Sequence, residues 1–139
     1  ELHQSDAATI ALPDASVDMV FCHQSFHHLI NQDQAIEEFF RVLKPGGVLL
    51  FAESCRRYIH SYMIRIFFRH PMDVQKTDLE YIDLITQTGF TVKPEHVSRP
   101  FLWWSQPDLG LLSHFGLKAK EIEGQREETM VNLVAYKPE

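Results

Sequence analysis

Three histidines stand directly after a short apolar segment in the N-terminal third of the chain. The segment Val17–Cys22 predicts a buried strand, and His23, His27 and His28 follow it closely. Imidazole is the side chain that changes charge nearest to neutral pH, so His27 or His28 could act as a general base toward a bound molecule. The alternative is that both rings are packing residues at the start of a helix. His27 and His28 are therefore candidate catalytic residues.

The spacing of His23 and His27 also invites a comparison with metal sites. Two histidines four positions apart resemble the zinc-binding pair of the pattern H-E-x-x-H, but Gln24 occupies the place of the general-base glutamate. The histidines also follow a strand directly, whereas that zinc pair lies within a helix. We therefore expect no metal site from this pair.

A basic stretch forms a second chemical feature. Residues 54–72 contain four arginines and no acidic residue. This stretch could be a lid that binds an anionic substrate, an amphipathic helix that touches a membrane or a partner, or an ordinary covering helix with a solvated basic face. Further along, Trp103 and Trp104 could wall a substrate pocket or pack between the last two strands. The arginines are Arg56, Arg57, Arg65 and Arg69.

The elements that would position these residues alternate between strands and helices. A helix is predicted after Asn31, with Gln34 as its capping-box partner, and it leads through the turn Lys44–Gly47 into a strand at Val48–Ala52. The continuous apolar run of that strand is typical of a strand covered on both faces. An extended segment is predicted at 1–6, a helix over 55–70 that Pro71 ends, and a helix that begins at Thr77, is capped by Glu80 and is closed by Gly89. A strand opens at 90–92, a short helix follows Pro107, and the last strand covers 129–136. This order indicates an α/β architecture.

Composition narrows the possible classes of protein. The 139 residues suit one domain, and 45% hydrophobic with 23% charged residues is typical of a globular protein. No apolar run approaches the ~18 residues of a membrane span, so we expect no membrane anchoring. The net charge of −6 disfavours nucleic-acid binding. Cys22 and Cys55 are too few for a disulfide scaffold, and no signal peptide precedes them, so we expect a cytoplasmic protein.

Several short motifs occur in a recognisable order. They are Asp6-Ala7 with Leu12-Pro13 and Val17–Val20, then Phe26–Leu29, then Glu37–Gly47, and finally Thr88–Phe90. Together they resemble the class I S-adenosylmethionine-dependent methyltransferases, closely over residues 6–54 and loosely over 77–137. The resemblance implies a Rossmann-like α/β sheet with an antiparallel last strand, S-adenosylmethionine as cofactor and a small molecule as methyl acceptor.

The resemblance is incomplete at the N-terminal side. The family's glycine-rich loop and the acidic residue that holds the cofactor ribose are absent from the sequence. We therefore expect residues 1–139 to form a single partial methyltransferase domain, truncated at the N-terminus and retaining strands three to seven. The fourth strand of the family would then lie at an open sheet edge, which invites a homodimer.

The resemblance also assigns candidate cofactor contacts. It implies that the Asp6 carboxylate accepts a hydrogen bond from the adenine amino group and that the backbone N–H of Ala7 contacts the ring. Cys22 and His23 would line the methionine portion, since ligands bind outside the carboxyl ends of parallel strands. A non-catalytic interaction module that dimerises through the open edge is the alternative. A nicotinamide-binding protein is disfavoured because no G-x-G-x-x-G fingerprint is present.

Overall fold

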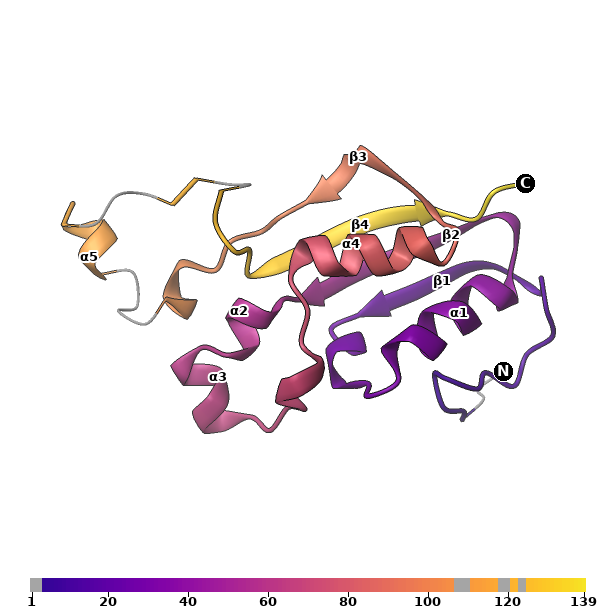
Figure 1. Cartoon of the computed structure of the whole chain (residues 1–139), viewed down its shortest axis with the longest axis horizontal. Helices are drawn as coiled ribbons and strands as arrows, with labels where there is room; N and C mark the ends of the chain where they lie inside the picture. Colours follow the sequence, from indigo (N-terminus) through magenta and orange to yellow (C-terminus); the bar gives the residue numbers. More distant parts are fainter. Residues whose placement is uncertain (1–3, 107–110, 118–120, 123–124) are drawn as a thin grey trace.

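One four-stranded sheet organises the part of the chain that the structure describes. The computed structural model describes residues 4–106, 111–117, 121–122 and 125–139 (Figure 1). The strands are β1 (Val17–His23), β2 (Leu43–Ser54), β3 (Thr91–Ser98) and β4 (Met130–Tyr136), and their order in the sheet is β1-β2-β4-β3. β1 runs parallel to β2, whereas β4 is antiparallel to both of its neighbours. The predicted α/β class and the antiparallel last strand are confirmed.

Helices cover one face of this sheet and the end at which β1 and β2 finish. The two longest, α1 (Gln32–Val42) and α4 (Asp78–Gln87), lie against the same face (Figure 1). Shorter elements follow the strand ends. These are the 3₁₀ turns η1 (Phe26–His28), η2 (Met72–Val74) and η3 (Trp103–Ser105), and the helices α2 (Arg56–Ile59), α3 (Tyr62–Phe67) and α5 (Leu111–His114).

The start of α4 shows how closely local sequence signals can determine an element. The Glu80 backbone N–H donates to Thr77 Oγ1 at 3.2 Å, and the Thr77 N–H donates to Glu80 Oε2 at 2.6 Å. This is the predicted capping box. Gly89, at φ +112°, ends the helix at the predicted residue. Asn31 also precedes α1 as predicted, but its side chain makes no capping hydrogen bond.

The core lies between the sheet and the two long helices. Leu49 and Phe51 of β2 are fully buried and belong to one cluster with Phe39 of α1 and with Tyr81 and Ile85 of α4. Burying apolar area of this kind is the main favourable contribution to folding. The alternate residues of β2 point to the other face and are only partly buried.

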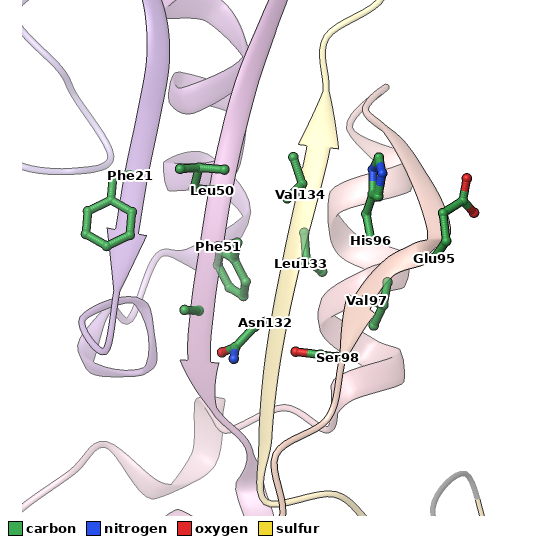
Figure 2. Close-up of a pocket in the computed structure, with 11 residues that line it drawn as sticks. Phe21, Leu50, Phe51, Glu95, His96, Val97, Ser98, Asn132, Leu133 and Val134 are labelled. Atoms are coloured by element: carbon green, nitrogen blue, oxygen red, sulfur yellow. The ribbon is translucent and has the colours of Figure 1, made fainter.

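The opposite face of the sheet carries a shallow apolar trough of about 350 Å³ (Figure 2). Its lining includes Phe21 of β1, Leu50 of β2 and Val134 of β4, with His96 and Asn132 beside them. Among the described residues no helix lies over this trough, so the prediction of strands covered on both faces is wrong for this part of the chain. The apolar run of β2 reflects one buried face and one partly open face.

The paired glycines in the first part of β2 serve two different backbone requirements. Gly46 adopts φ +75°, a conformation that side-chain-bearing residues rarely adopt. Gly47 is needed for space, because a Cβ atom there would lie 2.8 Å from the Lys44 carbonyl oxygen and 3.2 Å from that of Asp18. Both glycines lie in the stretch of β2 between Leu43 and Val48, where the pairing with β1 shifts register.

Two predictions about individual elements need correction. The described residues form four strands of the expected five, because Gln4–Asp6 join no strand; Glu1–His3 lie outside the described residues. The helix predicted over 55–70 is two helices, since His60 and Ser61 interrupt it, and Ser61 is extended at ψ 150°. The short helix predicted after Pro107 is present as α5 (Leu111–His114), and 107–110 lie outside the described residues. No described helix is long and apolar enough to cross a membrane.

Candidate functional site

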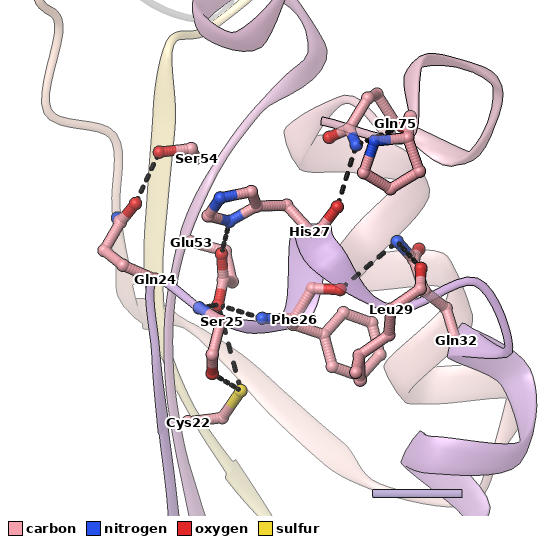
Figure 3. A network of polar contacts seen from close by, with 11 residues as sticks. Cys22, Gln24, Ser25, Phe26, His27, Leu29, Gln32, Glu53, Ser54 and Gln75 are labelled. Carbon is pink, nitrogen blue, oxygen red and sulfur yellow. Dashed lines mark hydrogen bonds and ion pairs between the residues drawn. The ribbon is translucent and has the colours of Figure 1, made fainter. Parts of the chain in front are cut away.

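A buried carboxylate holds the turn that follows β1. Glu53 of β2 has no exposed surface, and its Oε1 accepts hydrogen bonds from the backbone N–H of Ser25 at 2.6 Å and of Phe26 at 2.7 Å (Figure 3). Its Oε2 lies 2.6 Å from Nδ1 of His27. A carboxylate with two backbone donors is an acceptor, so Nδ1 of His27 donates and Nε2 is left for other contacts.

Amides tie this turn to its surroundings. Nε2 of Gln75 donates to the carbonyl oxygens of His27 at 2.8 Å and Pro71 at 2.6 Å, which fixes the segment after α3 against the turn. Ser54 Oγ donates to Oε1 of Gln24 at 2.5 Å. Gln24 itself adopts φ +49°, which is unusual for a residue other than glycine and is typical of functional sites.

Three histidine rings meet at a cavity beside the turn. His27 is buried, His28 is exposed and His70, which follows α3, is half-buried; the ligand nitrogens of the three rings lie within 4.8 Å of one another. The ring centroids of His27 and His28 are 4.2 Å apart, and those of His28 and His70 are 4.7 Å apart. All three rings line a cavity of about 190 Å³. Its other lining residues are Gln24, Ser54, Tyr58, Ile59, Ile64 and Phe68. We call His27, His28 and His70 the histidine cluster.

The cluster favours uncharged rings at its accessible positions. Burial, with the neighbouring His27 ring, lowers the pKa of His28. Burial lowers the pKa of His70 as well, and the rings of His28 and His27 add to the effect. Near neutral pH these two imidazoles therefore hold lone pairs that can accept a proton or bind an electrophile.

A second cavity adjoins the first at His28. It encloses about 270 Å³ between the turn at Asp6 and Ala8 and the segment His28–Asn31. The exposed Asp6 carboxylate accepts the Ala8 N–H through Oδ1 at 2.9 Å. Leu29 and Ile30 contribute apolar surface to the lining of the same cavity. A flat aromatic amine would suit this cavity, because its amino group could donate to the Asp6 carboxylate while its ring packs against the apolar side chains.

Arg41 of α1 holds the segment that carries Asp6. Its guanidinium donates to the carbonyl oxygens of Ile10 and Leu12, both at 2.9 Å, and to Asp14 Oδ1 at 2.6 Å. It also forms a two-bond pair with Glu38, whose Oε2 accepts the Ile10 N–H at 2.8 Å. This network fixes the predicted cofactor segment to α1.

The structure separates the other predicted cofactor residues. Ala7 is half-buried and packs against the core next to Asp6. Cys22 is buried, and its Sγ lies 3.8 Å from Glu53 Oε1 and 3.5 Å from Ser25 Oγ. His23 is exposed, stacks on Phe21 at 5.8 Å and lines neither cavity. His23 and His27 therefore do not form a pair, whereas His27 and His28 come together with His70.

The Cys22 thiol should be unreactive in the folded chain. Burial raises its pKa from 9.0 to about 11, and the Glu53 charge adds to this.

The folded chain then holds ~100-fold less thiolate than the unfolded chain at pH 8. Folding stability should correspondingly fall as pH rises from 9 towards 11, where only the unfolded chain loses the proton. Iodoacetamide labelling followed by mass spectrometry checks the rate, with the urea-unfolded chain as control; equal rates in both would contradict the expectation.

The basic stretch lines the cavity at the histidine cluster with its uncharged residues and His70, whereas its four arginines and the two tryptophans line neither cavity. Arg57 pairs with Glu121 at 2.6 Å, and Arg56 approaches Glu80 and Glu127 at 3.4 and 3.3 Å. Arg56 and Arg57 are thus paired with acidic residues of the same chain. Trp103 is exposed, and Trp104 meets the edge of Tyr58 with the ring centroids 5.5 Å apart. The tryptophans therefore do not pack between the last two strands.

Two residues central to the site were not singled out from the sequence. Glu53 ends an apolar strand, and a carboxylate at such a position must find partners if it is buried. That signal could have marked Glu53 as a structural anchor. His70 carried no such signal, because only the hydrogen bonds of Gln75 bring its segment to the turn.

Comparisons with known proteins bear on this arrangement. Residues 1–51 match the family model described as "Methyltransferase domain". Over this segment the chain is similar to S-adenosylmethionine-dependent methyltransferases. The predicted family is thus confirmed, and the cofactor of this family is S-adenosylmethionine.

Individual relatives extend the comparison. The chain is 48% identical over 56 residues to a Mycolicibacterium smegmatis protein named a probable S-adenosylmethionine-dependent methyltransferase. It is 33% identical over 69 residues to the demethylmenaquinone methyltransferase of Deinococcus radiodurans. These segments cover 40% and 48% of this chain but only 22% and 29% of the relatives. A Bacillus halodurans structure classed as a methyltransferase superposes with a TM-score of 0.67 at 21% identity, covering 100% of this chain and 78% of that one.

The residues around Asp6 fit one end of this cofactor. The carboxylate can accept from an adenine amino group, and Leu29 and Ile30 can face the ring. A cavity of about 270 Å³ is smaller than the ~300–1,000 Å³ typical of sites that enclose a whole ligand. The described residues therefore suit the adenine end, and the rest of the cofactor needs further groups.

Proposed function

We propose that this chain contributes to the transfer of a methyl group from S-adenosylmethionine to a small-molecule acceptor. In this proposal a part of the domain that the sequence does not contain supplies the glycine-rich loop. The observation that carries the proposal is the adjacency of the two cavities: His28 lines both the cavity at Asp6 and the cavity at the histidine cluster. Cofactor and acceptor sites must adjoin in this way, because methyl transfer requires the two reactants in line.

The two neighbouring histidines take different roles in this proposal. His27 donates to Glu53 through Nδ1 and so positions the turn. His28 is exposed, lies at the junction of the cavities and holds a lone pair at neutral pH, so it can accept a proton from the acceptor. When bound, the cofactor supplies the activated methyl group; the chain supplies alignment. Ala7, Cys22 and His23 remain proposed cofactor contacts through backbone atoms.

The proposed setting is cytoplasmic, without nucleic acid or a stable membrane anchor. The net charge of −6 opposes a polyanionic partner, and two of the arginines in the basic stretch are already paired. Both cysteines are free and buried, which suits a reducing compartment.

Calorimetric titration with S-adenosylhomocysteine tests the cofactor site in the 139-residue chain. We expect Asp6→Ala to weaken binding roughly 10- to 150-fold, because a hydrogen bond to a charged group contributes about 1.5–3 kcal/mol. Asp83→Ala is the matched control, since Asp83 is an exposed aspartate on α4 away from both cavities. Equal affinities of the two variants would contradict the role of Asp6.

A non-catalytic interaction module is the second candidate function. It is favoured by the position of β1 at the sheet edge, where Met19 and Phe21 are 56% and 67% exposed. This candidate predicts no heat with S-adenosylhomocysteine up to millimolar ligand, together with a homodimer in analytical ultracentrifugation. Micromolar binding by a monomer would exclude it.

A further inference from the structure

The ring nitrogens of the histidine cluster are well placed to act together. Among the described residues, the ring nitrogens of His28 and His70 have no protein hydrogen-bond partner, and Nδ1 of His27 faces Glu53. Each ring therefore offers at least one nitrogen, and one ring nitrogen of each histidine lies within 4.8 Å of one from each of the other two. Three imidazole nitrogens around one tetrahedral ion lie about 3.3 Å apart, so small side-chain rotations close the remaining gap.

The surroundings of His27 add an independent argument. Metal-binding histidines usually donate their second ring N–H to a carboxylate, which fixes the tautomer and the ring orientation. Glu53 provides this contact at 2.6 Å, and its two backbone donors and full burial hold the carboxylate in place. His27 is thus oriented in advance, with Nε2 as the nitrogen that remains available.

We propose that the histidine cluster binds a divalent transition-metal ion, such as Zn²⁺ or Co²⁺, through His27, His28 and His70. Three nitrogen ligands suit these ions rather than Mg²⁺ or Ca²⁺, which prefer oxygen. The fourth position opens into the cavity of about 190 Å³, and the exposed ring of His28 provides the entry path. The set differs from the His23–His27 pair, which the fold keeps apart.

Binding has one consequence for the proposed methyl transfer. A bound ion takes the lone pair of His28 that proton acceptance needs, so occupancy of the cluster and base action by His28 exclude each other. The metal site itself does not depend on the proposed function, because its ligands and its carboxylate partner are all described in this chain. If the chain failed to bind S-adenosylhomocysteine, the predicted metal site would still stand. If it failed to bind metal, the proposed cofactor site would still stand.

Titration of the untagged chain with Co²⁺ and with Zn²⁺ tests the proposal. We expect one equivalent of Co²⁺ to give visible d–d absorption, and Zn²⁺ to bind by calorimetry with the same stoichiometry and displace it. His70→Ala and His28→Ala should each weaken binding at least tenfold. His114→Ala, an exposed histidine on α5, should leave the affinity unchanged. Thermal melts by circular dichroism confirm that the variants are folded.

Glu53→Gln separates a built site from casual binding by surface histidines. Loss of a carboxylate partner typically costs 10- to 100-fold in metal affinity although no ligand is removed. Because Glu53→Gln is expected to be less stable, its metal affinity is measured at low temperature, where the variant is folded. We expect the folded variant to show this decrease in affinity. Absence of binding up to millimolar metal, or equal effects of His70→Ala and His114→Ala, would overturn the proposal.

Discussion

Replacing Glu53 with glutamine is expected to lower the free energy of unfolding by about 3 kcal/mol. The two side chains have nearly the same volume, so no cavity forms. The substitution removes the charge and places an amide NH₂ where the carboxylate accepted hydrogen bonds. A glutamine Oε1 can keep the two bonds from the backbone N–H groups of Ser25 and Phe26, but its NH₂ group then faces Nδ1 of His27. The His27 ring must therefore change tautomer or leave its Nδ1–H buried without a partner, and the charged acceptor is lost in either case. Each such group costs about 1–3 kcal/mol, and loss of a charged acceptor costs the upper part of that range.

Urea unfolding followed by circular dichroism measures this loss. Glu37→Gln on α1 is the matched control, because Glu37 is exposed and the change there should stay within about 0.5 kcal/mol. A loss below 1 kcal/mol for Glu53→Gln would mean that water or another acceptor replaces the carboxylate, and Glu53 would not be the anchor of the turn.

Phe26→Ala is expected to cost about 3–5 kcal/mol. Phe26 is 1% exposed, and its ring meets Phe51 edge-on with centroids 5.2 Å apart, Tyr81 at 6.1 Å and Phe39 at 6.0 Å. Truncation leaves a cavity bounded by three rings from β2, α4 and α1. Since a domain of this size is stable by only about 5–15 kcal/mol, the variant should melt well below the wild type.

Phe21→Ala provides the comparison for this prediction. Phe21 is also an aromatic residue of the same segment, but it lies 67% exposed on the open face of the sheet. Its loss should change the free energy of unfolding by at most about 0.5 kcal/mol, as measured by the same urea titration. If Phe21→Ala cost as much as Phe26→Ala, the open face would be covered in solution by a part of the chain that the structure does not describe or by a second molecule.

The sequence predicted best those elements whose signals are local. The capping box of Thr77 and Glu80 and the end of α4 at Gly89 depend on residues within one turn of each other, and each was placed correctly. The prediction of one helix over 55–70 is wrong, because the helical spacing of apolar residues persists across Ser61 although the backbone at that residue is extended. Nothing in the periodicity distinguishes one helix from two that meet at an angle.

The candidate site was predicted only where it follows a single strand. His27 and His28 were found because they come directly after β1, and ligands gather at strand ends. His70 was not found, since its approach depends on Gln75 and on the interruption between α2 and α3. The trough at Phe21 and Leu50 was likewise missed, because an apolar run does not specify which of its two faces is covered.

The position of Glu53 has a consequence for the order in which the protein folds. The backbone of Ser25 and Phe26 and the ring of His27 depend on a residue that lies 26 to 28 positions later in the chain. During synthesis this turn leaves the ribosome before its acceptor exists, and no helix of its own stabilises it meanwhile. It can settle only after β2 has paired along β1, and His70 can join only after that. The histidine cluster therefore cannot form before the chain has been synthesised at least as far as Gln75.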